Sequence, residues 1–192
     1  MANVNAAFGL VPVRHMSGNI PRANKYTITS GLAENIFSGD LCILTADGVI
    51  TPHTATETNN IGVFAGVSYT ASDGSYVYSE YWPSGTTATN IIAYVYDDPY
   101  IVYKIQSAGT PTQASIGECA DVVAGAGSTV TGRSGFSLNG TMSNGTATCK
   151  IIALHDTPDN SMAQYAVLEV LVNEHLLKAT AGILGRLDKG YE

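Results

Sequence analysis

The chain contains four histidines and two short acidic stretches, which are the residue types that could supply metal ligands or acid/base groups. The histidines lie in four separate segments: His15, His53, His155 and His175. The stretch from His155 to Asp159 places one imidazole beside two carboxylates, a set of donors that could bind a metal ion. Short acidic loops are mostly turns in which aspartate accepts hydrogen bonds from backbone amides, so we interpret this stretch as a turn.

A second acidic candidate is the pair Asp97 and Asp98, directly before Pro99. Two carboxylates could bind Ca²⁺ or share acid/base work. Adjacent residues on a strand point to opposite faces, however, and Asp-Pro is a common end of a strand, so a turn is favoured. The chain has no GxSxG motif, and Gly125-Ala126-Gly127 is not followed by the lysine of a phosphate loop. We therefore predict no catalytic residue, no metal site and no cofactor.

The three cysteines, Cys42, Cys119 and Cys149, are far apart and odd in number. A zinc site would need closely spaced pairs, and a disulfide framework would need an even count, so buried free thiols are predicted. The N-terminus lacks the basic and apolar regions of a signal peptide, and no apolar run approaches the roughly 18 residues of a membrane span. We expect synthesis in a reducing cytoplasm and no membrane partner.

The charge balance disfavours nucleic acid as a partner. Nine Lys and Arg residues stand against sixteen Asp and Glu, for a net charge of −7, and the basic residues are scattered. Phosphate binding needs a basic stripe. Charged residues make up 13% of the chain, about half of the ~25% typical of soluble domains. A low charged fraction suits a chain with many turns, and also one that buries surface in an assembly.

The stretch from Asn60 to Pro99 predicts three successive antiparallel strands. Its apolar or alternating runs are Ile61–Tyr69, Tyr76–Trp82 and Ile91–Tyr96, separated by Ser-Asp-Gly and Pro-Ser-Gly turns. Eight of the eleven tyrosines fall between Tyr69 and Tyr103. Tyrosines at this density could form an interface or pair across strands within one sheet, and both interpretations stay open.

Further strands are expected on both sides of this centre. A hairpin around Asp47-Gly48 and a strand over Tyr100–Gln106 belong to the central part of the chain. Residues 110–128 contain the one mid-chain helix candidate. A hairpin with its tip near Thr141 to Ser143 is expected to join Val130–Leu138 to Thr146–Leu154. A last strand is expected over Tyr165–Asn173.

The two ends are apolar but irregular. Residues 1–24 contain two prolines and two glycines among apolar residues, which indicates an extended arm lying on its own domain or on a partner, or alternatively an edge strand. We predict a mainly β fold, an antiparallel sandwich or barrel-like domain with an extended N-terminal arm and little helix. The expected parts are an arm at 1–24, a central β domain at 25–108, a second β region at 109–173 and a C-terminal arm at 174–192.

Several segments carry a resemblance to a known family. They are MANVNAAFGLVPVRHMSGNIPRANKYTI, SGDLCILTADGVITP followed by a loop and NNIGVFAGVSY, and then EYWP, AYVYDDPYIVYKIQ and GRSGFSL. Residues 39–66 follow the order Gly-Asp, apolar strand, Asp-Gly, Val, Thr-Pro, loop and Ile-Gly-Val-x-Ala-Gly. These segments resemble structural proteins of tailed-bacteriophage virions, above all the head decoration (cement) proteins. The motifs are loose but cover most of the chain, which is longer than the smallest decoration proteins and so predicts an added β region from Gly109 onward.

The resemblance implies a catalytically inert protein that binds the outer surface of a virion capsid and stabilises the shell. It implies the major capsid protein as partner and a homo-oligomer, with a trimer favoured. Partner-binding residues are expected in the two ends: Phe8, Leu10, Val11, Pro12, Val13, Arg14, Leu176 and Leu177. Removal of residues 1–24 is expected to leave a folded domain that no longer binds shells. The alternatives are another virion component (minor capsid, tail or fibre-associated) and a β-sandwich glycan-acting enzyme.

Overall fold

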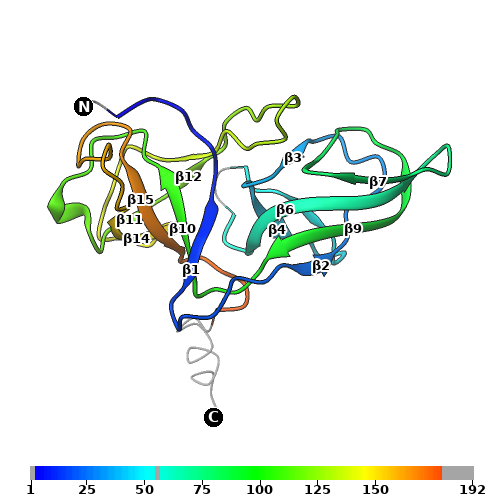
Figure 1. The fold of residues 1–192 in the computed structure, drawn as a ribbon. Helices are drawn as coiled ribbons and strands as arrows, with labels where there is room; N and C mark the ends of the chain where they lie inside the picture. Colours follow the sequence, from blue (N-terminus) through cyan, green and yellow to red (C-terminus); the bar gives the residue numbers. More distant parts are fainter. Residues whose placement is uncertain (1–2, 55–56, 179–192) are drawn as a thin grey trace, which may run out of the picture.

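The computed structural model describes residues 3–54 and 57–178, and this part of the chain is mainly β (Figure 1). All pairs of named strands are antiparallel and form two principal sheets in a sandwich-like arrangement, as the sequence predicts. No helix in the described ranges is long and apolar enough to cross a membrane. The elements are β1 (Val11–His15), β2 (Asn24–Tyr26), β3 (Ile36–Phe37), β4 (Leu41–Leu44), β5 (Ile50–Pro52), β6 (Asn60–Ala71), β7 (Tyr76–Ser79), β8 (Tyr81–Trp82), β9 (Ala88–Tyr96), β10 (Ile101–Gln106), the 3₁₀ helix η1 (Gln113–Ser115), β11 (Cys119–Ala120), β12 (Val122–Val123), β13 (Ser137–Leu138), β14 (Cys149–Leu154) and β15 (Val167–Val172).

The first sheet has five strands in the order β1-β10-β15-β14-β11. Alternate residues of β10, Ile101, Tyr103 and Ile105, are buried in a cluster with Leu168 and Val170 of β15. Because side chains alternate across a strand, the other residues of β10 face the opposite side of the sheet. This sheet forms the half of the molecule that carries β10, β14 and β15 in Figure 1.

The second sheet is built on β6 and has the order β2-β9-β6-β4-β5. Strand β9 pairs with β6 on one side, while β4 pairs near the start of β6 and β7 near its end on the other side. A Cβ at Gly62 would collide with the backbone of Tyr96, so the close approach of β9 requires glycine there. Phe64 and Val67 of β6 enter a second buried cluster with Trp82.

The predicted strands of the central stretch are present as β6, β7 and β9, with one difference. The run Tyr76–Trp82 is divided, because Tyr81–Trp82 leaves the sheet and pairs with β3 instead. The fully buried Trp82 ring packs edge-on against Tyr69, which ties this short ribbon to the second core. The three cysteines are buried free thiols, as expected.

The expectations for the region after residue 108 were partly wrong. Residues 110–128 form only η1 and the short strands β11 and β12, with no α-helix. Residues 130–138 contribute only β13, which pairs with β12, while β14 pairs with β15 and β11, so the predicted hairpin does not form. The physical reason is burial, since Cys149 and Ile151 complete the first core beside β15.

The N-terminal region belongs to the domain. Residues 11–15 form the edge strand β1 on β10, which was the alternative to an extended arm lying on its own domain or on a partner. The boundary expected at residue 108 does not separate the sheets, because β10 pairs with β1 and β15. Leu10 is 1% exposed in the first core. Removal of residues 1–24 would therefore take a core side chain and an edge strand from the fold, against the expectation of an intact domain.

Candidate functional site

The segment that precedes β1 is anchored on the chain's own surface. Asn3 Nδ2 donates to the carbonyl oxygens of Ser161 and Gln164, both at 3.0 Å. Gln106 of β10 is 3% exposed beneath the segment, where its amide donates to Val4 O at 2.7 Å and accepts from Ala6 N at 3.0 Å. These hydrogen bonds hold residues 3–6 on the face of the first sheet opposite its core.

The anchored segment then passes through a tight junction with two other loops. Leu10 N donates to Gly39 O at 2.8 Å, and Gly9 N donates to Phe136 O at 3.0 Å. Gly9 has a φ of +75°, and a Cβ there would lie 2.5 Å from both Gly39 O and Ser134 Cβ. Only glycine fits this combination of backbone angle and close approach. The junction fixes where the chain enters β1.

A groove of about 890 Å³ opens beside this junction, between the two sheets. One wall is formed by N-terminal residues, among them Phe8, Val11 and Pro12. The opposite wall is the segment Val63–Ala65 of β6, flanked by Tyr78 and Tyr96, and loop residues 126–134 contribute a third wall. The charged residues of the lining are Lys104, Arg133 and Glu80. The groove is thus mainly uncharged, with basic groups on two sides.

The structure sorts the predicted partner-binding residues into three groups. Phe8, Val11 and Pro12 line the groove and are half-buried. Leu10 also touches the groove, but it serves the chain's own core, so its proposed role as a contact residue is corrected. The remaining predicted residues are exposed: Val13, Arg14, Leu176 and Leu177. Leu177 does not share the groove of Phe8, Val11 and Pro12, because it lines a second groove together with His15 and residues 18–22.

Arg14 is held in place by an ion-pair cluster. Its guanidinium donates to Glu169 Oε2 at 2.8 Å, and His155 Nδ1 lies 3.1 Å from Glu169 Oε1. Burial acts to raise the pKa of Glu169, but the hydrogen bonds from His155 and Arg14 outweigh it and lower the pKa. The cluster joins β1 to β15 across β10, and it takes His155 away from the acidic stretch that follows it in sequence.

The acidic pair Asp97 and Asp98 also serves structure. Asp97 accepts hydrogen bonds from Asn24 Nδ2 and the Tyr26 hydroxyl, both at 2.7 Å. Asp98 accepts from His15 Nε2 at 3.1 Å. The two carboxylates therefore bind different partners. Within residues 3–54 and 57–178, no three His, Cys, Asp or Glu side chains come together to hold a metal ion.

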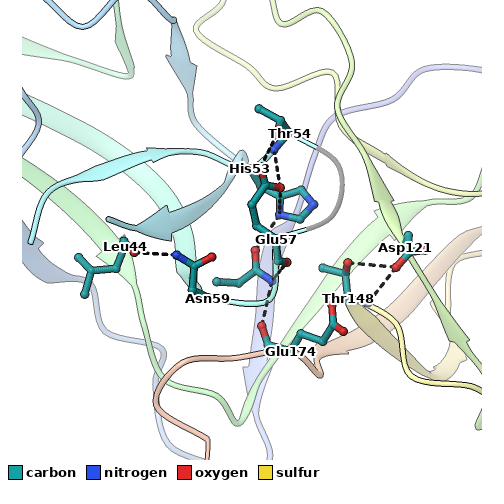
Figure 2. A network of polar contacts seen from close by, with 9 residues as sticks. Leu44, His53, Thr54, Glu57, Asn59, Asp121, Thr148 and Glu174 are labelled. Atoms are coloured by element: carbon teal, nitrogen blue, oxygen red, sulfur yellow. Dashed lines mark hydrogen bonds and ion pairs between the residues drawn. The ribbon is translucent and has the colours of Figure 1, made fainter. Parts of the chain in front are cut away.

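A polar network lies where the C-terminal end of the first sheet meets the start of β6 (Figure 2). Asn60 Nδ2 donates to Glu57 O at 3.1 Å and to Glu174 O at 2.9 Å. Its Oδ1 therefore accepts from His53 Nδ1, 2.8 Å away, which places a proton on Nδ1. His53 Nδ1 also lies 3.4 Å from the Glu57 carboxylate. The buried Asn60 thus joins two segments that are distant in sequence.

The same network continues to the strands of the first sheet. Thr148 donates from its backbone N and its hydroxyl to Asp121 Oδ1, each at 3.2 Å, as Figure 2 shows. Burial raises the pKa of Glu174, and the nearby Asp121 carboxylate raises it further, while His53 and Thr148 oppose the change. The geometry supports a structural joint between the sheets.

Residues after β15 complete this joint. Leu176 N donates to Asn60 O at 2.8 Å, and His175 Nδ1 accepts from Leu177 N at 3.1 Å. His175 is 3% exposed, and its Nε2 has no hydrogen-bond partner among the described residues. Burial lowers its pKa to about 4, so the imidazole is neutral in the folded protein at pH 7.

The clustered tyrosines divide between the core and the surface. Tyr69 is buried against Trp82, whereas Tyr76 and Tyr78 of β7 are 72% and 64% exposed. The Tyr78 ring lies 6.3 Å from that of Tyr94 and covers Gly66. Part of the set therefore packs across strands, and part forms an exposed aromatic surface on β7.

The residues that sequence reasoning missed are the buried polar ones. Asn60 stands at the start of the central stretch and His175 lies in the expected C-terminal arm, yet both are almost fully buried. Asp40 is 1% exposed although it is an acidic residue next to a glycine. A signal was present for Asp40, because it stands directly before the apolar run 41–44.

Comparison with known proteins adds no further constraint. No family model matches the chain, and neither a curated protein nor a solved structure matches it.

Proposed function

We propose that the protein is a structural component of a bacteriophage virion, a decoration protein that binds the outer capsid surface and stabilises the shell. The resemblance of its segments to this class supports the proposal. The structural observation that carries it furthest is the groove between the sheets. There Phe8, Val11 and Pro12 present half-buried apolar surface next to the exposed edge residues Val13 and Arg14.

The physical demands of shell binding fit such a surface. A decoration protein contacts many identical sites, so weak contacts at each copy add up through multivalency. Apolar surface with a low density of charge is typical of the centre of an interface. Lys104 and Arg133 at the groove suit an acidic rim on the major capsid protein. We place the protein on the outside of the virion, after synthesis in the host cytoplasm, with no catalytic role.

Binding to isolated shells tests the proposal. Purified protein is mixed with undecorated capsids and bound protein is measured by co-sedimentation. We expect saturable binding that Val13→Asp weakens tenfold or more, which corresponds to about 1.4 kcal/mol. Val123→Asp is the matched control, since Val123 is an exposed valine of β12 outside the groove. Equal loss in both variants, or no binding of the native protein, would overturn the proposal.

The oligomeric state forms a second part of the proposal. We propose a homo-oligomer, with a trimer favoured, in which the exposed Tyr76 and Tyr78 of β7 contact a sister subunit. Light scattering after size exclusion is expected to report a trimer, and Tyr76→Ser with Tyr78→Ser to report monomers. A monomeric native protein would reject this part alone.

The alternative functions give different outcomes in the same tests. A tail or minor capsid protein would bind at the vertex or tail and leave the shell faces bare. A glycan-acting enzyme would release soluble sugars from cell-wall glycans. Sugar release at a catalytic rate would replace the structural proposal with an enzymatic one.

A further inference from the structure

Two Asn-Gly pairs lie between β13 and β14, and the fold places them in different surroundings. They are Asn139-Gly140 and Asn144-Gly145. In an Asn-Gly pair the glycine has no side chain to shield its backbone nitrogen or to restrict the backbone, so this nitrogen can reach the carboxamide of the asparagine. Each pair is therefore a candidate for conversion of the asparagine through a cyclic imide.

The first pair is held by the fold. Asn139 is half-buried, its backbone N donates to Asp121 O at 2.8 Å, and its Oδ1 accepts from Thr141 N at 3.3 Å. The backbone of Gly140 packs against Gly109 so closely that a Cβ on Gly109 would lie 2.5 Å from Gly140 Cα. Attack by Gly140 N on the Asn139 carboxamide would require this packing to open.

The second pair lies in an exposed loop. Asn144 and Gly145 are both exposed, and the Asn144 side chain forms no hydrogen bond within the described ranges. Gly145 N donates to the hydroxyl of the exposed Ser143 at 3.3 Å, a contact that water can replace. The loop is fixed on both sides, because Ser143 exchanges backbone hydrogen bonds with Cys119 and Thr148 is 1% exposed. The residues between these two anchors can therefore rearrange while the core stays closed.

We propose that Asn144 is a site of covalent modification, at which the folded protein converts asparagine to aspartate and isoaspartate. Gly145 N loses its proton to solvent and forms a bond to Cγ of Asn144, while the Cγ–Nδ2 bond breaks and Nδ2 takes up a proton and leaves as ammonia. Water then opens the cyclic succinimide at either carbonyl. Each conversion replaces a neutral amide by a carboxylate. Neither residue lines the two grooves, so the inference is independent of shell binding.

Timed incubation of the full chain in mildly alkaline buffer tests the inference. Peptide mapping by mass spectrometry follows the conversion of Asn139 and Asn144 in the same sample, once in the folded protein and once in guanidinium chloride. Two variants are treated in parallel: Asn144→Gln removes the site, and Gly145→Ala shields the attacking nitrogen. A Cβ at Gly145 would lie 3.4 Å from Ser143 Oγ, an ordinary contact, so alanine fits the folded loop.

We expect Asn144 to be converted about tenfold faster or more than Asn139 in the folded protein, because reaction at Asn139 must first break a hydrogen bond and open packed backbone. In guanidinium chloride the two rates should be similar, since the fold no longer protects Asn139. Gly145→Ala should slow the conversion at Asn144 and leave the rate at Asn139 unchanged. Asn144→Gln should remove the acidic form that appears first on isoelectric focusing.

Three results would overturn the inference. The first is conversion of Asn139 and Asn144 at equal rates in the folded protein. The second is no conversion at Asn144, or persistence of the first acidic form in Asn144→Gln. The third is the same ratio of rates in the folded and the unfolded chain, because the fold would then have no part in selecting the site.

Discussion

Asp40 combines a carboxylate with an almost fully buried position. Its Oδ2 accepts from Phe37 N at 2.7 Å, while Oδ1 has no hydrogen-bond partner among the described residues. Burial raises its pKa to about 6, against the opposing effects of Ser134 and of the Phe37 amide. The folded protein therefore holds a proton between about pH 4 and pH 6 that the unfolded chain releases, and stability falls as the pH rises through this window.

Asp40→Asn is predicted to increase the free energy of unfolding at pH 7. An amide keeps the acceptor for Phe37 N and removes the buried charge, a gain of up to about 3 kcal/mol. Urea unfolding at pH 4.5 and pH 7 should show the gain mainly at the higher pH. Asp159→Asn, at an exposed loop position, serves as the control and should leave the free energy of unfolding unchanged at both pH 4.5 and pH 7. Lower stability of the Asp40 variant at pH 7 would contradict this account.

Gly9 is predicted to be intolerant of any side chain. Gly9→Ala combines a positive φ with a Cβ 2.5 Å from Gly39 O, whereas Gly74→Ala has a similar φ of +86° in open space. The second change should cost about 1 kcal/mol through backbone strain alone. We expect Gly9→Ala to cost at least about 2 kcal/mol more by thermal or urea unfolding. A matched loss in the two variants would show that the junction is not tightly packed.

At the scale of elements, residues 173–178 after β15, here called the clasp, link the two sheets by hydrogen bonds. His175, buried next to the hydrogen bonds of Asn60, is neutral because burial lowers its pKa to about 4. The ordinary value is about 6.5. The contribution of the neutral His175 to the free energy of unfolding is therefore complete above about pH 6.5 and is lost as the pH falls towards 4.

His175→Gln is predicted to flatten the loss of stability between pH 6.5 and pH 4. Glutamine cannot take up the proton, so this variant should retain more of its neutral-pH stability in acid than the native protein does. Urea unfolding across this range measures the slope, and hydrogen exchange of the Leu176 amide reports the clasp itself. The Asp40→Asn variant must change the slope in the opposite direction. If both variants change the slope of the unfolding free energy against pH in the same direction, the pKa shift given for Asp40 or the one given for His175 is wrong.

The elements that the sequence predicts well are those that local pattern controls. The alternating runs of β6, β9, β10 and β15 are each present within a few residues of their expected bounds. The hairpin expected over residues 130–154 does not form, because the turn signals Asn139-Gly140 and Asn144-Gly145 indicate a reversal of the chain but do not select its partner strands. Strand β14 pairs with β15, where its apolar side chains are buried. This contact joins segments that are separated in the chain, so a short stretch of sequence does not predict it.

The candidate site was predictable only in part for the same reason. Phe8, Val11 and Pro12 stand out as apolar residues in an irregular segment, and they line the groove. Their neighbour Leu10 has the same local signal but enters the core. Asn60 and His175 could not be paired from the sequence, because 114 residues separate Asn60 from the Glu174 carbonyl that it binds.

At the scale of the whole molecule, the two sheets are connected at two places. The first is the polar network of Asn60 together with the clasp after β15. The second is the Gly9 junction, beside which the N-terminal groove lies. A groove built on such a joint has a fixed shape, so binding does not require the ordering of a free arm. The proposed contact with a capsid is therefore a preformed surface rather than a flexible extension.

Imaging of capsids saturated with the protein tests the central claim most directly. We predict added density on the outer surface of undecorated shells at symmetry-related positions, with the groove of Phe8, Val11 and Pro12 facing the major capsid protein. Density restricted to a vertex or tail, or shells that remain bare at saturating protein, would contradict the assignment as a decoration protein.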